Sequence, residues 1–177
     1  VCESYADIEC AVYAVGGWED GYSNAVARML AHLSCPVKGL VGPWGHKYPE
    51  QGIPEPAIGF LQHSLRWWDH WLKGINTGIM DEPAYTMFLQ EHVAPDACLD
   101  AVPGKWITEP SWPSPRIKTR QLFLNASGLG YEAEDETLLS HESPQTLGVA
   151  GGSWCPYGLG GVSPDLAVDQ REDDGRS

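Results

Sequence analysis

Short apolar runs and one helical pattern alternate over the first part of the chain. Residues 10–15 form a continuous apolar run that predicts a buried strand, and the glycines and Asp-Gly pair within residues 16–21 predict a turn after it. Apolar side chains recur at helical spacing over residues 24–33, and a second short apolar run covers residues 37–41. The order strand, helix, strand predicts a βαβ unit, in which the two strands are parallel.

The strongest helical pattern covers residues 57–73. Apolar side chains separated by three or four positions define one face of this helix, which we expect to pack on the core: Ile58, Leu61, Leu65, Trp68 and Leu72. Trp67 and Trp71 widen the apolar surface, so we expect the helix to pack on two sides. Gly74 is placed to act as the C-cap.

The pattern changes near residue 81. Residues 84–90 are β-prone, a proline-rich connection follows over residues 93–115, and residues 118–124 alternate between polar and apolar in the way that suits a sheet with one wet face. We therefore predict two units, an α/β unit in residues 1–80 and the beginning of a β domain in residues 81–177.

Composition and charge exclude several classes of protein. The chain has 177 residues, of which 42% are hydrophobic and 20% charged, so it can bury a core. Its formal net charge of −13 argues against nucleic acid and acidic membrane surfaces as partners. No apolar run reaches the roughly 18 residues that a membrane span needs. The five cysteines show no C-x-x-C spacing, so we expect no zinc site or disulfide framework and favour a reducing compartment, the cytoplasm.

Two side chains follow the two strands of the predicted βαβ unit. Asp20 comes just after the first strand and His46 just after the second. Carboxyl ends of parallel strands open on the same edge, where ligands bind, and neighbouring strands lie about 5 Å apart, so the two loops can bring these side chains into contact. A carboxylate on one imidazole nitrogen fixes the tautomer, and the other nitrogen can take a proton from a nucleophile.

Each of these residues also has a plain structural explanation. Asp-Gly is a common turn dipeptide, so Asp20 can equally cap the following helix, and a single loop histidine such as His46 is more often structural or solvated than catalytic. Trp18 could wall a substrate pocket or pack the turn, whereas for Trp44 we favour packing. The remaining histidines and acidic residues lack ligand spacing, so we expect no metal and no cofactor.

Two tryptophan-containing turns carry a resemblance to a known family. Gly17-Trp18-Glu19-Asp20-Gly21 followed by Gly42-Pro43-Trp44-Gly45-His46 resembles the CocE/NonD hydrolases of the X-Pro dipeptidyl-peptidase (peptidase S15) superfamily. The similarity continues through residues 66–74 (RWWDHWLKG), 109–113 (EPSWP) and 120–124 (RQLFL) and covers nearly the whole chain. In that family the Asp and the His of these turns complete a Ser-His-Asp triad, which implies those roles for Asp20 and His46, with Trp18 as a candidate substrate contact.

The resemblance also implies a fold and an activity. The fold would be the C-terminal part of an α/β-hydrolase domain in residues 1–80, followed by the start of a β-sandwich, or jelly-roll, domain in residues 81–177. The activity would be that of a serine hydrolase, acting without a cofactor on an ester or amide bond, including X-Pro peptide bonds, of a small molecule or short peptide. Whether ester or amide is preferred is left open, as is a homo-oligomer.

The nucleophilic serine of that family lies upstream of the Asp, and this chain contains no Gly-x-Ser-x-Gly sequence. We therefore expect the chain to be an internal piece of a longer enzyme and to be inactive by itself. The alternative is a non-catalytic binding or interaction fragment, for which the β region would supply the surface.

Overall fold

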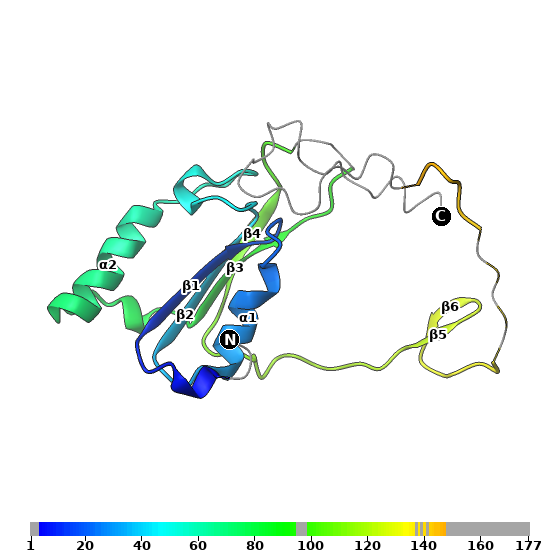
Figure 1. The fold of residues 1–177 in the computed structure, drawn as a ribbon, viewed down its shortest axis with the longest axis horizontal. Coiled ribbons are helices and arrows are strands. Elements are labelled where there is room, and N and C mark those ends of the chain that lie inside the picture. Colours follow the sequence, from blue (N-terminus) through cyan, green and yellow to red (C-terminus); the bar gives the residue numbers. More distant parts are fainter. Residues whose placement is uncertain (1–3, 95–98, 137, 139, 141, 148–177) are drawn as a thin grey trace.

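The computed structural model describes residues 4–94, 99–136, 138, 140 and 142–147 (Figure 1). Its strands are β1 (Val12–Gly17), β2 (Val37–Gly42), β3 (Tyr85–Gln90), β4 (Gly104–Glu109), β5 (Phe123–Asn125) and β6 (Gly128–Gly130). Its helices are α1 (Ser23–His32) and α2 (Phe60–Lys73), with the 3-10 turns η1 (Tyr5–Asp7), η2 (Pro49–Gln51) and η3 (Ile79–Asp81). No helix within these described ranges has the length and apolar character to span a bilayer.

The main sheet contains four strands in the order β1-β2-β3-β4. β1 and β2 are parallel, with Val12 opposite Val37 and Gly17 opposite Gly42, and they are connected through α1. The βαβ unit predicted from the alternation of apolar runs is therefore confirmed. β3 adds in parallel to β2, and β4 turns back antiparallel to β3.

The helices cover opposite faces of this sheet (Figure 1). On the α1 face, Ala14, Val26, Leu30, Val41 and Tyr85 form one buried cluster. Because side chains alternate along a strand, the residues of β1 on either side of Ala14 point to the α2 face.

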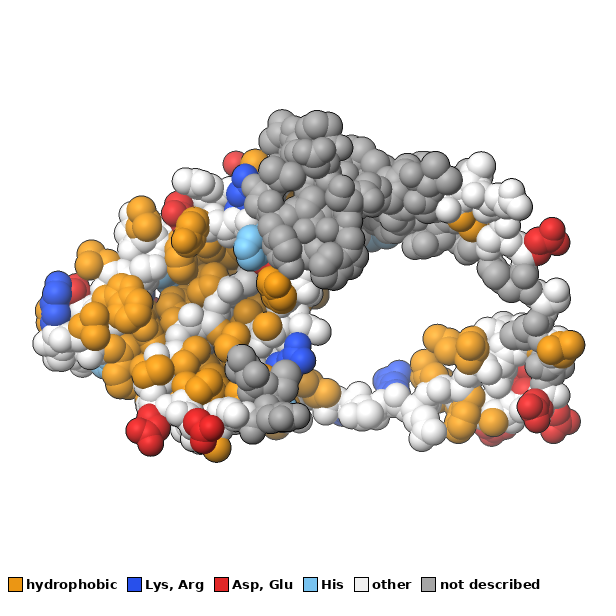
Figure 2. All heavy atoms as spheres, in the orientation of Figure 1, with side chains coloured by type: hydrophobic (Ala, Val, Ile, Leu, Met, Phe, Trp, Pro, Cys, Tyr) orange, Lys and Arg blue, Asp and Glu red, His pale blue; other side chains and the backbone are white. Residues whose placement is uncertain are grey.

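The orientation of α2 differs from the prediction. Trp67 is its buried residue, at 3% exposed, and its ring lies 5.3 Å from that of Tyr13 on β1. The face expected to pack on the core is exposed instead: Leu61 65%, Leu65 58%, Trp68 53% and Leu72 74%. The helix has two apolar sides, and the side that carries Trp67 is the one that packs on the sheet. Figure 2 shows hydrophobic side chains gathered over α2.

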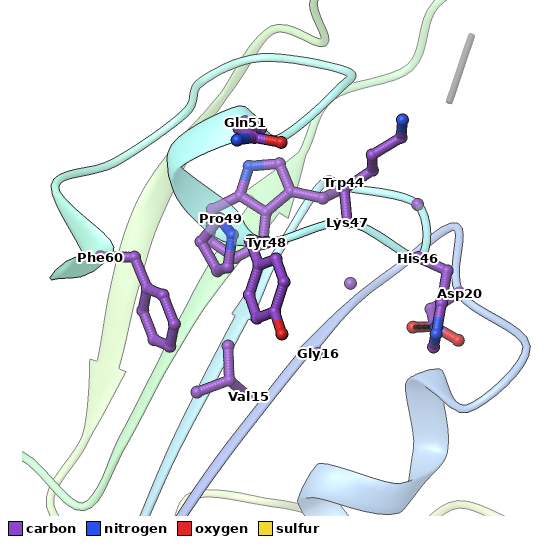
Figure 3. A pocket seen from close by; sticks show the side chains of 12 residues that line it. Val15, Gly16, Asp20, Trp44, His46, Lys47, Tyr48, Pro49, Gln51 and Phe60 are labelled. Atoms are coloured by element: carbon purple, nitrogen blue, oxygen red, sulfur yellow. Dashed lines mark hydrogen bonds and ion pairs between the residues drawn. The ribbon is translucent and has the colours of Figure 1, made fainter. Parts of the chain in front are cut away.

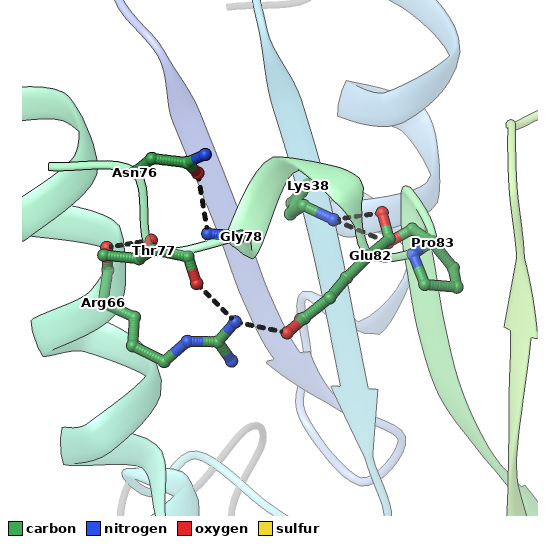
Figure 4. A network of polar contacts seen from close by, with 7 residues as sticks. All are labelled: Lys38, Arg66, Asn76, Thr77, Gly78, Glu82 and Pro83. Atoms are coloured by element: carbon green, nitrogen blue, oxygen red, sulfur yellow. Dashed lines mark hydrogen bonds and ion pairs between the residues drawn. The ribbon is translucent and has the colours of Figure 1, made fainter. Parts of the chain in front are cut away.

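The middle and the C-terminal end of α2 are held by local contacts. Gly74 ends the helix in the left-handed conformation, with φ of 68°, as predicted for the C-cap. Beyond it, Arg66 bonds the carboxylate of Glu82 at 2.6 Å, and the Thr77 hydroxyl donates to the Arg66 carbonyl at 3.0 Å (Figure 4). Lys38 of β2, 4% exposed, donates to the carbonyl oxygens of Glu82 and Pro83 at 2.5 and 2.9 Å. Burial lowers the pKa of the Lys38 ammonium. This network ties α2 to β2 and to the start of β3.

The main sheet extends past the predicted boundary near residue 81. β3 pairs with β2, and β4 pairs with β3, so residues 85–109 belong to the same sheet as residues 12–42. Local β-propensity predicts a strand but does not say which sheet it joins, and this is why the sequence misplaced the end of the first sheet. β5 and β6 form a separate two-stranded antiparallel ribbon. A β-sandwich in the rest of the chain stays a prediction, since residues 148–177 lie outside the described residues.

Candidate active site

Two loops leave the carboxyl edge of the main sheet side by side. β1 ends at Gly17 and β2 at Gly42, which are opposite each other in register. Beyond the strands, the Trp18 amide donates to the Gly42 carbonyl at 2.9 Å, and the Glu19 amide donates to the Trp44 carbonyl at 3.1 Å. The backbone pairing of these two segments therefore continues past the sheet and holds the two loops together.

Gly17 makes this close approach of the loops feasible. A Cβ atom on this residue would lie 1.8 Å from the carbonyl oxygen of Trp44, which is far inside van der Waals contact. The obstacle is backbone, so no rotamer change could relieve it. Glycine at the end of β1 is therefore required by the geometry of the neighbouring loop.

The two loops bring Asp20 and His46 into contact. Oδ2 of Asp20 lies 2.8 Å from Nδ1 of His46, and Oδ1 accepts the Tyr22 amide at 2.9 Å. The carboxylate thus uses one oxygen for its own turn and the other for the imidazole; the N-cap of α1 is Tyr22, which makes no side-chain capping bond, so Asp20 does not cap this helix. The Asp20 side chain is 11% exposed and that of His46 is 50% exposed. A proton on Nδ1, shared with the carboxylate, places the lone pair of the neutral ring on Nε2.

Trp44 anchors the loop that carries His46. It is 1% exposed, its indole N–H donates to the Pro56 carbonyl at 2.8 Å, and its ring lies 6.0 Å from that of Trp106. Cβ atoms on Gly42 and Gly52 would come within 2.5 and 2.1 Å of the indole, so the ring fits against backbone at both glycines. This arrangement is that of a packing residue, the role favoured for Trp44.

Trp18 is fixed in a different way. Its indole N–H donates to the carbonyl of Phe88 on β3 at 2.6 Å, and the side chain is 37% exposed. This bond fastens the loop that carries Asp20 to the middle of the sheet. Trp18 is not among the residues that line the cavity beside His46, and a contact with substrate stays a prediction.

A cavity of about 410 Å³ opens beside the Asp20–His46 pair (Figure 3). Its wall is built from the end of β1, the His46 loop and the start of α2: Val15, Gly16, Gly17, Asp20, Trp44, Gly45, His46, Lys47, Tyr48, Pro49, Gln51 and Phe60. Sequence reasoning missed Tyr48, Pro49 and Phe60; the available signal was that Tyr48 follows His46 by two positions in the same loop.

The chemistry that these residues offer is proton transfer. The cavity wall, as far as the described residues form it, includes no serine and no cysteine. Within the described part of the chain, no group of three His, Cys, Asp or Glu side chains is arranged to hold a metal ion. A carboxylate in contact with an imidazole is an arrangement that can support proton transfer to or from a group brought to it.

This chain is similar to a known family and to two curated proteins. Residues 1–48 match the family X-Pro dipeptidyl-peptidase (S15 family). The chain is 31% identical over 123 residues to "Putative serine esterase Mb1866c" of Mycobacterium bovis and to "Putative serine esterase MT1883" of Mycobacterium tuberculosis. Each match covers 66% of this chain and 18% of the relative, so the chain spans less than a fifth of the length of these relatives.

The fold is similar to that of a solved hydrolase. Two crystal structures of SACOL2612, a CocE/NonD family hydrolase from Staphylococcus aureus, match with TM-scores of 0.50 and 0.52 at 14% identity. Both matches cover 73% of this chain and 22% of the solved chain, and they bear on the fold alone. The family match at residues 1–48 and the curated relatives make this chain similar to the X-Pro dipeptidyl-peptidase (S15) family and to serine esterases, in agreement with the resemblance seen in its two tryptophan-containing turns.

Proposed function

We propose that Asp20 and His46 are the orienting acid and the general base of a serine hydrolase that cleaves ester or amide bonds. The observation that carries this proposal is the 2.8 Å contact between Asp20 Oδ2 and His46 Nδ1 at the carboxyl edge of parallel strands. Burial of the carboxylate and half-exposure of the imidazole suit these roles, because the acid is kept in place while the base can meet a substrate. The curated relatives named as serine esterases support the same class of reaction.

The proposed reaction has two acyl-transfer steps. His46 Nε2 takes the proton of a serine hydroxyl while the oxygen attacks the substrate carbonyl, and the resulting imidazolium gives that proton to the leaving alcohol or amine. Water then attacks the acyl-serine while His46 Nε2 takes its proton, and the imidazolium gives that proton to the serine oxygen as the acid is released. Asp20 holds the ring and stabilises the imidazolium in both steps. We propose that the serine comes from sequence outside these 177 residues and approaches His46 from the cavity.

Labelling with a fluorophosphonate tests this proposal, because the reagent phosphonylates only an activated serine. The 177-residue chain would be compared with the longer protein encoded by its flanking open reading frame. We expect label on the longer protein, with labelling and ester turnover lower by about 10⁴-fold in Asp20→Asn and His46→Ala.

Matched controls for these variants are Asp135→Asn and His92→Ala, which change exposed residues of the same types. They should label like the unmodified protein. Retention of most labelling in Asp20→Asn or His46→Ala would contradict the proposal. Absence of label from the longer protein would favour a binding module instead.

A further inference from the structure

We propose that the cavity beside His46 is a binding subsite for an uncharged, ring-shaped apolar group, held between Tyr48 and Phe60. The inference rests on the proposed function in one respect, that the bound group would be part of the substrate of the same site. It goes further by assigning the residues that select this group and its chemical class.

Three apolar side chains from separate segments converge on the cavity. Val15 comes from β1, Tyr48 from the His46 loop and Phe60 from the first position of α2. Figure 3 shows the Tyr48 ring between Phe60 and the Asp20–His46 pair, with Val15 beneath it. Tyr48 is 71% exposed, so its ring gains apolar burial when a ligand covers it.

Glycines of β1 and of the His46 loop contribute backbone rather than side chains to the cavity wall. A Cβ on Gly16 would point to the opposite face of the sheet, where it would meet a methyl group of Val26 at 3.1 Å. At Gly45, which follows Trp44 in the loop, the nearest atom to an added Cβ would be the Ile53 carbonyl at 3.8 Å. The cavity is therefore bounded near His46 by bare backbone and on its far side by aromatic rings, the usual composition of a small-molecule site.

The volume of the cavity and the charges in its wall determine which chemical class of group it can bind. The volume of about 410 Å³ lies within the range of roughly 300–1,000 Å³ found for ligand pockets and exceeds what one ring requires. The carboxylate of Asp20 already accepts bonds from His46 and from the Tyr22 amide, and the other fully charged side chain of the wall is the cation Lys47. The ammonium of Lys47 disfavours a cationic ligand and the carboxylate of Asp20 disfavours an anionic one, so a neutral ring fits best.

The position of the cavity beside His46 relates ring binding to the proposed hydrolysis. The imidazole lies at one end of the cavity and Phe60 at the other, with Tyr48 between them (Figure 3). A substrate with its carbonyl at His46 would project its acyl or alcohol side group toward the two rings. Tyr48 and Phe60 are thus specificity-determining residues rather than members of the proton-transfer machinery.

Binding can be measured on the 177-residue chain without any turnover. Benzyl alcohol serves as the neutral ring probe, ethanol as the same hydroxyl without a ring, and benzylammonium as the cationic analogue. Amide chemical shifts of Gly45 and Lys47, recorded by NMR during each titration, report occupancy of the cavity. We expect saturable shifts with benzyl alcohol and weaker binding of ethanol and benzylammonium.

Variants locate the site. Tyr48→Ala and Phe60→Ala should each weaken benzyl alcohol binding by about fivefold or more. Leu61→Ala, at the next position of the helix but 65% exposed and outside the cavity wall, should leave the affinity unchanged. Tyr48 is largely exposed, so its variant is expected to fold.

Unchanged affinity in both aromatic variants, or equal shifts from ethanol, would overturn the subsite. Because binding is read without hydrolysis, the two proposals fail separately. If benzyl alcohol did not bind, fluorophosphonate labelling would still support the proposed reaction. If the longer protein were not labelled, binding of benzyl alcohol would still support the subsite.

Discussion

Oδ2 of Asp20 lies 2.8 Å from Nδ1 of His46, although the two residues are 26 positions apart in the sequence. The contact follows from two features of the backbone. The strands that precede them are parallel neighbours in register, and the loops that carry them exchange amide-to-carbonyl bonds beyond the last strand pair.

The Asp20 carboxylate should fix the tautomer of His46. At about pH 9, where an ordinary imidazole is neutral, we expect the proton of His46 on Nδ1 in the unmodified chain. In Asp20→Asn the carboxylate acceptor is lost, and the Nε2–H form should gain population. Long-range ¹H–¹⁵N correlation spectra distinguish the two forms, and His92 serves as an internal control. An Nε2–H tautomer in the unmodified chain would contradict the prediction.

Trp44 should contribute strongly to stability because its ring is buried against two glycines and Trp106. Trp44→Ala is expected to lower the free energy of unfolding by about 3–5 kcal/mol, the usual effect of removing a buried aromatic side chain. Trp68→Ala, on the exposed face of α2, should change it by no more than about 0.5 kcal/mol. Urea unfolding followed by circular dichroism measures both. Similar losses in the two variants would show that the burial of Trp44 is not what supports the loop.

Gly17 should be intolerant of any side chain. In Gly17→Ala the new Cβ would meet the Trp44 carbonyl, so we expect a loss of about 1–3 kcal/mol or more and displacement of the His46 amide resonance. Gly45→Ala is the matched control, since the nearest atom to its new Cβ would be 3.8 Å away, and it should be nearly neutral. The measurements are urea midpoints and amide spectra. An unperturbed His46 resonance in Gly17→Ala would refute the link between the two loops.

Alkaline unfolding should depend on Tyr85. Burial raises the pKa of its hydroxyl to about 12, from an ordinary value of about 10. Because the folded pKa lies above the unfolded one, the stabilisation is fully present below about pH 10 and is lost as the pH rises toward 12. Tyr85→Phe removes this titration. The free energy of unfolding should fall in both proteins between about pH 9 and 12, but the fall should be about 2 kcal/mol smaller in Tyr85→Phe than in the unmodified chain.

Urea unfolding at a series of alkaline pH values measures this difference. Burial also raises the pKa of Tyr13 to about 12, so part of the alkaline loss should persist in Tyr85→Phe. Tyr131→Phe, which changes a residue that is 68% exposed, should follow the unmodified chain throughout. A Tyr85→Phe profile that coincides with the Tyr131→Phe profile would contradict the prediction.

Sequence periodicity predicted the local part of this structure well. The βαβ unit is local in sequence, and its parallel pairing follows from the length of the connection, so the contact between Asp20 and His46 could be anticipated. Their catalytic roles stay predictions.

What the sequence did not predict depends on non-local packing. α2 has two apolar sides, and hydrophobic spacing alone does not say which one meets the sheet; the choice is made by the contact of Trp67 with Tyr13. The assignment of β3 to the first sheet likewise depends on pairing with a strand more than forty positions away, as in Gly39 with Tyr85. Tyr48 and Phe60 have no motif, and their shared cavity is visible only once the loop is folded.

The pairing of Gly17 with Gly42 has a consequence for how this segment can change. Spacing between the acid and the imidazole is set by strand register, by the bonds at the loop bases and by the start of the crossover, where the amides of Tyr22 and Ser23 bind Asp20. The part of the crossover beyond this first turn could therefore change in length or sequence without altering the spacing between the two side chains. In that sense residues 12–46 form a transferable unit, which holds its acid–imidazole contact through its own backbone pairing.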